Sequence, residues 1–154
     1  MPAIDHLVYA SPDLAEGIAR IEALTRVRPQ EGGVHPGVGT RNALVGLGDD
    51  CYLEVVGIDP DQPAPDFGRP FGIDDRQDPG LVAWAIHPTR GESLADVAGR
   101  LRASGFDPGE PVTMSRTTPA GEELNWRLTF PIAGVGALPF VIDWGDTESP
   151  ARSA

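Results

Sequence analysis

Two ionisable side chains lie where the sequence predicts buried strands, and both suit proton transfer. His6 falls within the apolar stretch Ala3–Tyr9, AIDHLVY. Because imidazole titrates near neutral pH, His6 can act as an acid or a base. The alternative is a core histidine whose ring is hydrogen-bonded by Asp5 or by a backbone carbonyl.

Glu54 lies in the middle of a second apolar stretch, YLEVV. Burying a carboxylate is unfavourable unless the group is paired, so its position needs an explanation. A salt bridge to Arg41 or Arg127 is one explanation. A general base whose pKa is raised by desolvation is the other, and we favour a role of Glu54 in a site.

Other polar residues are weaker candidates for a site. His35 lies in the glycine-rich segment GGVHPGVGTRN, which has no lysine and no strong helix after it, and so does not match a phosphate-binding loop. It belongs either to a turn at a strand edge or to the rim of a site. Arg41 and Asn42 are neighbours in a predicted strand, so one faces inward and the other outward.

The segment NWRLTF places Asn125 and Arg127 on one face of a predicted strand, and Trp126 and Leu128 on the other. If the polar face points inward, Asn125 and Arg127 can hold a carboxylate or a carbonyl oxygen. A solvated sheet edge explains the same pattern equally well.

Two helices and eight strands account for the remaining patterns. Ser11-Pro12-Asp13 predicts a helix start with Ser11 as N-cap and Pro12 at the first helical position. Gly91-Glu92-Ser93 predicts a second start, and Ser104-Gly105 ends that helix. Strands are predicted near residues 3–9, 33–35, 41–47, 52–57, 81–87, 112–115, 124–130 and 138–144.

The order strand, helix and three strands therefore occurs twice, with an offset of about 80 residues that aligns Leu14 with Leu94. We expect one α+β domain over residues 1–154, with module one at 3–57 and module two at 81–146. Residues 58–80 contain five prolines and six aspartates without periodicity, which predicts a linker or an ordered loop.

Composition excludes several classes of protein. The 154 residues carry a net charge of −11, and all 12 basic residues are arginine. Such an acidic chain repels nucleic acid and anionic lipid surfaces, so we expect neither as a partner. The segments are too short and too often charged to predict a membrane span or a secretory signal. The single cysteine, Cys51, cannot form an internal disulfide, and we expect a cytoplasmic protein.

Four phrases resemble the glyoxalase-like members of the vicinal oxygen chelate superfamily, which also includes glyoxalase I, extradiol dioxygenases and bleomycin-resistance proteins. They are IDHLVYASPDL, GGVHPGVGTRNALVGLGDDCYLEVVGIDPDQP, NWRLTFP and LPFVIDWGD. The resemblance implies two βαβββ modules whose mixed sheet curls into a cup around one site. Many such relatives form dimers, so it also implies a homodimer.

In metal-using relatives the ligands come from the first and fourth strands of each module, and the matching positions in module one are His6 and Glu54. In module two the matching positions are Trp84 and Ile142, which supply no ligand. We therefore expect no stoichiometric metal and no other cofactor, with His6 and Glu54 as the donors if a divalent ion binds. Trp84 then lines the pocket or packs in the core.

The resemblance implies a small-molecule site. If the protein is an enzyme, we expect a lyase or isomerase that acts on a small carbonyl or hydroxy compound. Glu54 would be the base, His6 the acid or its partner, and Arg127 the anion stabiliser. The substrate-binding residues would be His35, Arg41, Asn42, Trp84 and Asn125. The alternatives are a protein that sequesters a drug or metabolite without turnover, and a domain that serves only in assembly.

Overall fold

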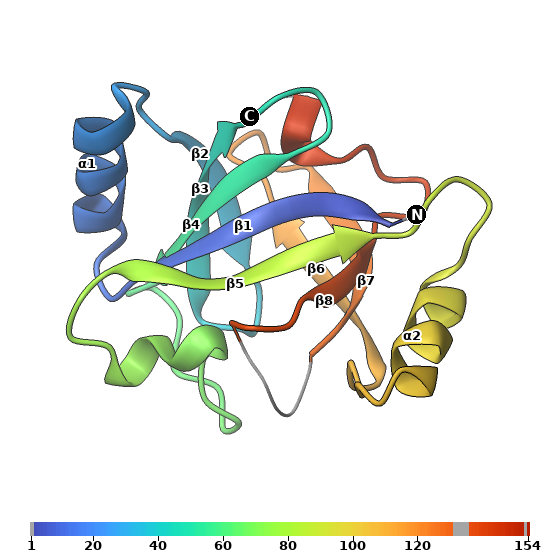
Figure 1. Ribbon diagram of the computed structural model, residues 1–154. Coiled ribbons are helices and arrows are strands. Elements are labelled where there is room, and N and C mark those ends of the chain that lie inside the picture. Colours follow the sequence, from blue (N-terminus) through green and yellow to red (C-terminus); the bar gives the residue numbers. More distant parts are fainter. Residues whose placement is uncertain (1, 131–135, 153) are drawn as a thin grey trace.

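The computed structural model describes residues 2–130, 136–152 and 154, which form one closed β-barrel with helices on its outside (Figure 1). The elements of the first half are β1 (Ala3–Ser11), α1 (Leu14–Thr25), β2 (Gln30–His35), β3 (Thr40–Gly46) and β4 (Tyr52–Ile58). Those of the second half are β5 (Gly80–His87), α2 (Leu94–Ala103), β6 (Pro111–Thr117), β7 (Glu123–Thr129) and β8 (Phe140–Asp143). The predicted α+β fold and its repeated element order are confirmed.

The strand order around the barrel is β1-β4-β3-β2-β6-β7-β8-β5. Each half contributes four adjacent strands, and the halves meet at two seams. At one seam β1 pairs antiparallel with β5 over most of both strands. At the other seam β2 and β6 share a single backbone pair, Val34 with Thr117. The chain thus closes the cup without strands from a second copy.

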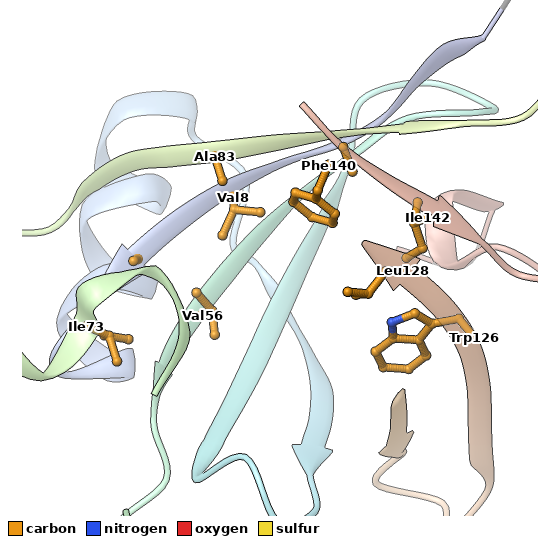
Figure 2. Close-up of a cluster of buried hydrophobic side chains, with 10 residues drawn as sticks. Val8, Val56, Ile73, Ala83, Trp126, Leu128, Phe140 and Ile142 are labelled. Carbon is orange, nitrogen blue, oxygen red and sulfur yellow. The ribbon is translucent and has the colours of Figure 1, made fainter. Parts of the chain in front are cut away.

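Alternation along the strands separates an interior core from two exterior ones. Figure 2 shows side chains from several strands, such as Val8 on β1, Leu128 on β7 and Phe140 on β8, that point into the interior of the barrel. Outside, α1 packs through Leu14 and Ile21 on the outward residues of β3 and β4. Helix α2 packs through Leu94 and Val97 on Val141 of β8.

The first helix begins differently from the prediction. Asp13, not Ser11, is the N-cap, because its carboxylate accepts hydrogen bonds from the backbone N–H groups of Ala15 and Glu16 at 2.8 and 3.3 Å. Ser11 is still part of β1, and Pro12 precedes the cap. The second helix begins as predicted, with a capping box between Ser93 and Asp96.

Residues 59–79 form an ordered connection between the halves rather than an extended tether. They contain η1 (Pro70–Asp75), whose Ile73 is fully buried in the interior core. The short helix η2 (Pro150–Arg152) lies at the opposite end of the barrel, as the green and red segments in Figure 1 show. Ala151 of η2 packs against Leu44 and Tyr52. The two ends of the barrel are therefore covered by different segments of the chain.

No helix in the described ranges has the length and apolar character required to cross a membrane.

Candidate functional site

Polar side chains converge on a small cavity of about 50 Å³ inside the barrel. One side of its lining carries hydrogen-bonding and charged groups from β1, β2, β3, β4 and β6. The other side is apolar and comes mainly from β7, β8 and η1. The polar lining residues are His6, His35, Thr40, Asn42, Tyr52, Glu54 and Arg116.

His6 is held in place by a neighbour in sequence. The Asp5 carboxylate lies 2.6 Å from Nδ1 of His6, and its other oxygen accepts a hydrogen bond from the indole N–H of Trp144 at 3.1 Å. Because a carboxylate only accepts hydrogen bonds, Nδ1 carries the hydrogen. The ring also stacks on Tyr52, with 4.7 Å between ring centroids. These contacts direct Nε2 of His6 toward Glu54, 3.9 Å away.

Glu54 is 9% exposed and lies between two histidines. Oε1 accepts a hydrogen bond of 2.7 Å from the side-chain amide of Asn42 and lies 3.7 Å from Nε2 of His35. Nδ1 of His35 lies 2.9 Å from the Thr40 hydroxyl. The carboxylate is therefore buried and fixed, while its second oxygen faces His6.

Arg116 supplies the positive charge of the site. Its side chain is buried, and its guanidinium donates a hydrogen bond of 3.3 Å to the amide oxygen of Asn42. A Cβ at Gly32 would lie 2.4 Å from a guanidinium nitrogen and 2.3 Å from the Asn42 oxygen, so only glycine fits beside this contact. Asn42 thus joins Glu54, His35 and Arg116 through one amide group.

Burial changes the pKa values of several groups in the site. Desolvation lowers the pKa of His35, although the nearby Glu54 carboxylate opposes this effect. Desolvation also lowers the pKa of Arg116, with Glu54 again acting in the opposite direction. Burial raises the pKa of Tyr52 well above its usual value. His35 is therefore neutral at pH 7, whereas Arg116 keeps its charge because an arginine pKa lies far above neutrality.

The barrel brings together four residues that the sequence analysis proposed for the site. These are His6, His35, Asn42 and Glu54. The expectation that only one of Arg41 and Asn42 faces inward is correct: Asn42 lines the cavity. Arg41 lies on the outer face, in a groove that also contains Asp59 and Asp61. It neither contacts the interior site nor pairs with Glu54 there.

The predicted inward face of β7 is wrong. Asn125 and Arg127 are exposed, whereas Trp126 and Leu128 are buried in the interior core. Burying the indole and the leucine removes more apolar surface from water than burying an amide and a guanidinium would, so the opposite face of the strand points inward. Asn125 and Arg127 therefore do not line the cavity.

Trp84 does not line the interior cavity either. It is paired with Leu7 across the β1–β5 seam, and it lines a groove on the outside of the barrel. The inward residues of β5 are Ala83 and Ala85. Ala85, not Trp84, lies opposite His6.

Arg116 is a site residue that sequence reasoning did not assign, whereas Asp5 was considered only as a hydrogen-bond partner of His6, a contact that the structure confirms. The strand containing Arg116 was expected to end at Ser115, but β6 continues to Thr117. A longer strand would have placed Arg116 on the same face as Met114, which was the available signal. Asp5 precedes His6, and alternation predicts opposite faces for the two. A register shift between Ile4 and His6 lets both be buried on the same side.

A metal site of the kind implied by the resemblance does not fit these residues. Tyr52 of β4 pairs with His6 of β1, and Phe140 of β8 pairs with Ala85 of β5. Matching these pairs places Ala85 at the counterpart of His6, and Ile142 at the counterpart of Glu54. Two of the four positions that carry metal ligands in such relatives therefore hold hydrocarbon side chains here. Among the residues that the structure describes, no group of three or more His, Cys, Asp or Glu side chains is arranged to hold a metal ion.

A sequence model of a glyoxalase-like domain matches residues 4–154. The chain belongs to the glyoxalase-like domain family. The resemblance to the vicinal oxygen chelate superfamily is thereby confirmed. Among curated proteins, no sequence matches this glyoxalase-like chain.

Solved structures share the glyoxalase-like fold at low sequence identity. A hypothetical protein from Staphylococcus aureus superposes with a TM-score of 0.71 at 17% identity, over 99% of this chain and 63% of that one. This chain therefore spans less than two thirds of that protein. Methylmalonyl-CoA epimerase from Mycobacterium tuberculosis gives 0.56 at 18% identity, over 92% and 87% of the chains. A methylmalonyl-CoA epimerase in complex with methylmalonyl-CoA and NH4+ gives 0.59 at 20% identity, over 97% and 99%.

Proposed function

We propose that this glyoxalase-like protein is an acid–base enzyme, an isomerase or lyase, that acts on a small carbonyl compound. The observation that carries the proposal is the buried Glu54 carboxylate, which faces the cavity between His6 and Arg116. A buried carboxylate beside a fixed cation suits proton abstraction from carbon, because one group takes the proton and the other stabilises the charge that forms.

The proposed step balances within the site. Glu54 removes a proton from the carbon beside the carbonyl, and the C–H electron pair forms the C=C bond of an enolate. The carbonyl π electrons move to oxygen, where Arg116 stabilises the negative charge. Glu54 then returns the proton to carbon, either directly or by passing it to Nε2 of His6, which delivers it and returns to its starting state; this completes an isomerisation. In a lyase reaction the enolate electrons would instead expel a leaving group from the neighbouring carbon, and the leaving group would depart with its bonding pair and the proton held by Glu54.

The remaining polar residues position these groups. Asp5 and Trp144 fix the His6 ring, as described above, so that Nε2 faces Glu54. Asn42 orients both the Glu54 carboxylate and the Arg116 guanidinium. His35, neutral at pH 7, accepts a hydrogen bond from the Asn42 amide, with 3.3 Å between Nδ2 and Nε2, and so adds no charge beside Glu54.

The fold comparisons support this reaction class without identifying the substrate. Several of the similar structures, including the two described above, bear the name methylmalonyl-CoA epimerase, and removal and return of a proton beside a carbonyl also interconverts epimers. At 18–20% identity they share the fold with this chain. The residues assigned above, rather than those names, are the basis of the proposal.

A second candidate function is sequestration of a drug or metabolite without turnover, as in bleomycin-resistance proteins. The apolar side of the cavity favours it, because Trp126, Leu128 and Phe140 supply a hydrophobic surface for an organic molecule. Of these, Phe140 lies on β8, a strand that carries a ligand in metal-using relatives. Both functions place a small organic molecule in the same cavity and differ in what Glu54 does.

The substitution Glu54→Gln separates the two functions. Wild-type protein should exchange the α-hydrogens of 2-nonanone for deuterium in D₂O, followed by proton NMR. The variant should lose about 10²–10⁴-fold in rate while keeping most of its affinity, because the amide cannot act as a base. The exposed Glu123→Gln on β7 is the matched control and should keep the wild-type rate. Tight binding with no exchange by the wild type would favour sequestration instead.

Two further proposals concern the cellular location and the oligomeric state of the protein. With a single cysteine, the chain has no internal disulfide to maintain, and we propose that it works in the cytoplasm.

We also propose a homodimer, supported by the half-buried Trp84 and the exposed Leu81 on the outside of the β1–β5 seam. Light scattering that returns only the 16.3 kDa monomer at high concentration would contradict the dimer.

A further inference from the structure

A larger cavity of about 500 Å³ adjoins the interior cavity at the end of the barrel covered by η1. The two cavities share six lining residues, which are Val38, Pro70, Phe71, Met114, Phe130 and Phe140. We call the larger one the mouth. Its volume lies within the range of pockets that enclose small organic ligands, whereas the interior cavity holds only a head group.

An aromatic neck joins the mouth to the interior cavity. Phe71 lies 6.2 Å from Phe130 and 6.4 Å from Phe140, measured between ring centroids. Phe71 also has a φ of 64°, a left-handed conformation that a bulky residue rarely adopts. The kink in η1 therefore places this ring at the junction, where a ligand that occupies both cavities would contact it.

The described residues that line the mouth offer apolar surface and no unpaired charge. Phe67 is 79% exposed, and Val112 and Leu138 are 44% and 40% exposed at its edge. Of the described residues that line it, Arg69 alone is charged. Its guanidinium is occupied by Asp74 at 2.6 Å and by the carbonyl oxygen of Gly39 at 2.7 Å. A phosphate or nucleotide group would find no free cation here.

The charges at the interior end disfavour an anionic head group as well. Two carboxylates are buried at this end: Glu54 lines the cavity, and Asp5 lies behind the His6 ring. Among the described lining residues the one guanidinium is that of Arg116, and His35 is neutral at pH 7. A ligand carboxylate would add a third negative charge in a desolvated site. A carbonyl oxygen adds none, and it can accept a hydrogen bond from Arg116.

We infer that the ligand is an uncharged carbonyl compound with an apolar body, its carbonyl in the interior cavity and its hydrocarbon part in the mouth. This inference rests on the proposed function for the role of the carbonyl. It excludes carboxylates and acyl-CoA esters as preferred ligands. Both would carry negative charge into an acidic protein, and Arg116 is the one cation left without a carboxylate partner among the described residues that line the two cavities.

Four probes test the inference, and three of them keep either the hydrocarbon chain or the ketone group of the fourth, 2-nonanone. Binding is followed by titration of tryptophan fluorescence, since Trp126 and Trp144 line the interior cavity. The probes are 2-nonanone, nonanoate, acetone and octanoyl-CoA. We expect 2-nonanone to bind at least about tenfold more tightly than each of the other three. Nonanoate or octanoyl-CoA binding as tightly as 2-nonanone would overturn the inference.

A pair of valine variants locates the apolar body. Val112→Asp places a charge at the mouth and should weaken 2-nonanone binding at least about tenfold. Val27→Asp, at a residue 51% exposed and away from both cavities, should leave the affinity unchanged. Equal affinities for the two variants would overturn the placement of the hydrocarbon part.

The deuterium-exchange assay keeps this inference separate from the proposed function. If 2-nonanone binds tightly but its α-hydrogens do not exchange, the proposed function fails and the ligand class stands. If acetone exchanges with the same kcat/KM as 2-nonanone, the ligand class fails and the acid–base function stands.

Discussion

The two halves of the barrel share an element order but carry different side chains on their inward faces. The first half presents imidazole, amide and carboxylate groups from His6, His35, Asn42 and Glu54. The second half presents alanine, leucine, isoleucine and aromatic side chains, and of its described residues Arg116 on β6 is the one charged group in the cavity. The two halves therefore share an arrangement of helices and strands, but the polar groups of the site come mainly from the first half.

This difference shows which part of a repeated fold is fixed by packing and which part is free to vary. Both halves need a helix on the outer face and alternating strands, and both keep them. The inward positions tolerate either a polar network or hydrocarbon, provided that the network is fully hydrogen-bonded. On the polar side, Asn42 links Glu54, His35 and Arg116, and Asp5 links His6 and Trp144. On the apolar side, the buried indole N–H of Trp126 has no hydrogen-bond partner among the described residues.

The largest effect is expected from Arg116, the charged residue that the second half places in the cavity. Arg116→Gln should lower the rate of deuterium exchange by about 10²–10³-fold, because the enolate oxygen loses its charged partner. Arg127→Gln is the matched control on the neighbouring strand, and it should stay within about twofold of the wild type because Arg127 is exposed. Circular dichroism of both variants checks that the barrel is intact. Equal losses in the two variants would remove Arg116 from the proposed step.

A smaller effect is expected on stability, through His35 of the first half. Burial lowers the pKa of His35 below its value of 6.5 in the unfolded chain, so the unfolded state binds the proton first as the pH falls. Its contribution to stability is constant above pH 6.5 and is lost below it, by at most about 1.4 kcal/mol for each pH unit. Urea unfolding at pH 7.5 and 5.5 measures the loss.

The variant His35→Asn isolates that contribution from other acid-sensitive groups. Its free energy of unfolding should depend less on pH between 7.5 and 5.5 than that of the wild type. Parallel pH dependences for the two proteins would show that His35 takes up its proton equally in the folded and unfolded states.

Much of the fold could be predicted from the sequence because its signals are local. Alternation in AIDHLVY and YLEVV, and the Ser93 start of α2, depend on residues within one turn or one strand. The placement of His6 and Glu54 inside the cup came from the family resemblance, because alternation shows only which residues share a face with them. Local reasoning failed at Asn125 and Arg127, where both faces of the strand were plausible and the burial of Trp126 decided between them.

The remaining site residues depend on contacts between distant segments. Arg116 meets Asn42 only because β6 and β2 close the barrel, a pairing that no local pattern specifies. Asp5 joins the site through a register shift and through Trp144, which lies near the other end of the chain. Gly32 is needed beside Arg116 for a tertiary reason, although in sequence it resembles a turn glycine.

The most direct test of the central claim measures deuterium exchange and metal content on the same samples. The claim is that Glu54, with His6 and Arg116, moves the proton, and that Ala85 and Ile142 leave too few donors for the family's metal site. Elemental analysis should find no stoichiometric zinc, iron, nickel or manganese in purified, untagged protein. Chelator-treated wild type should then exchange the α-hydrogens of 2-nonanone at the untreated rate, and chelator-treated Glu54→Gln should not. About one equivalent of metal per chain, lost together with exchange in His6→Ala, would contradict the claim.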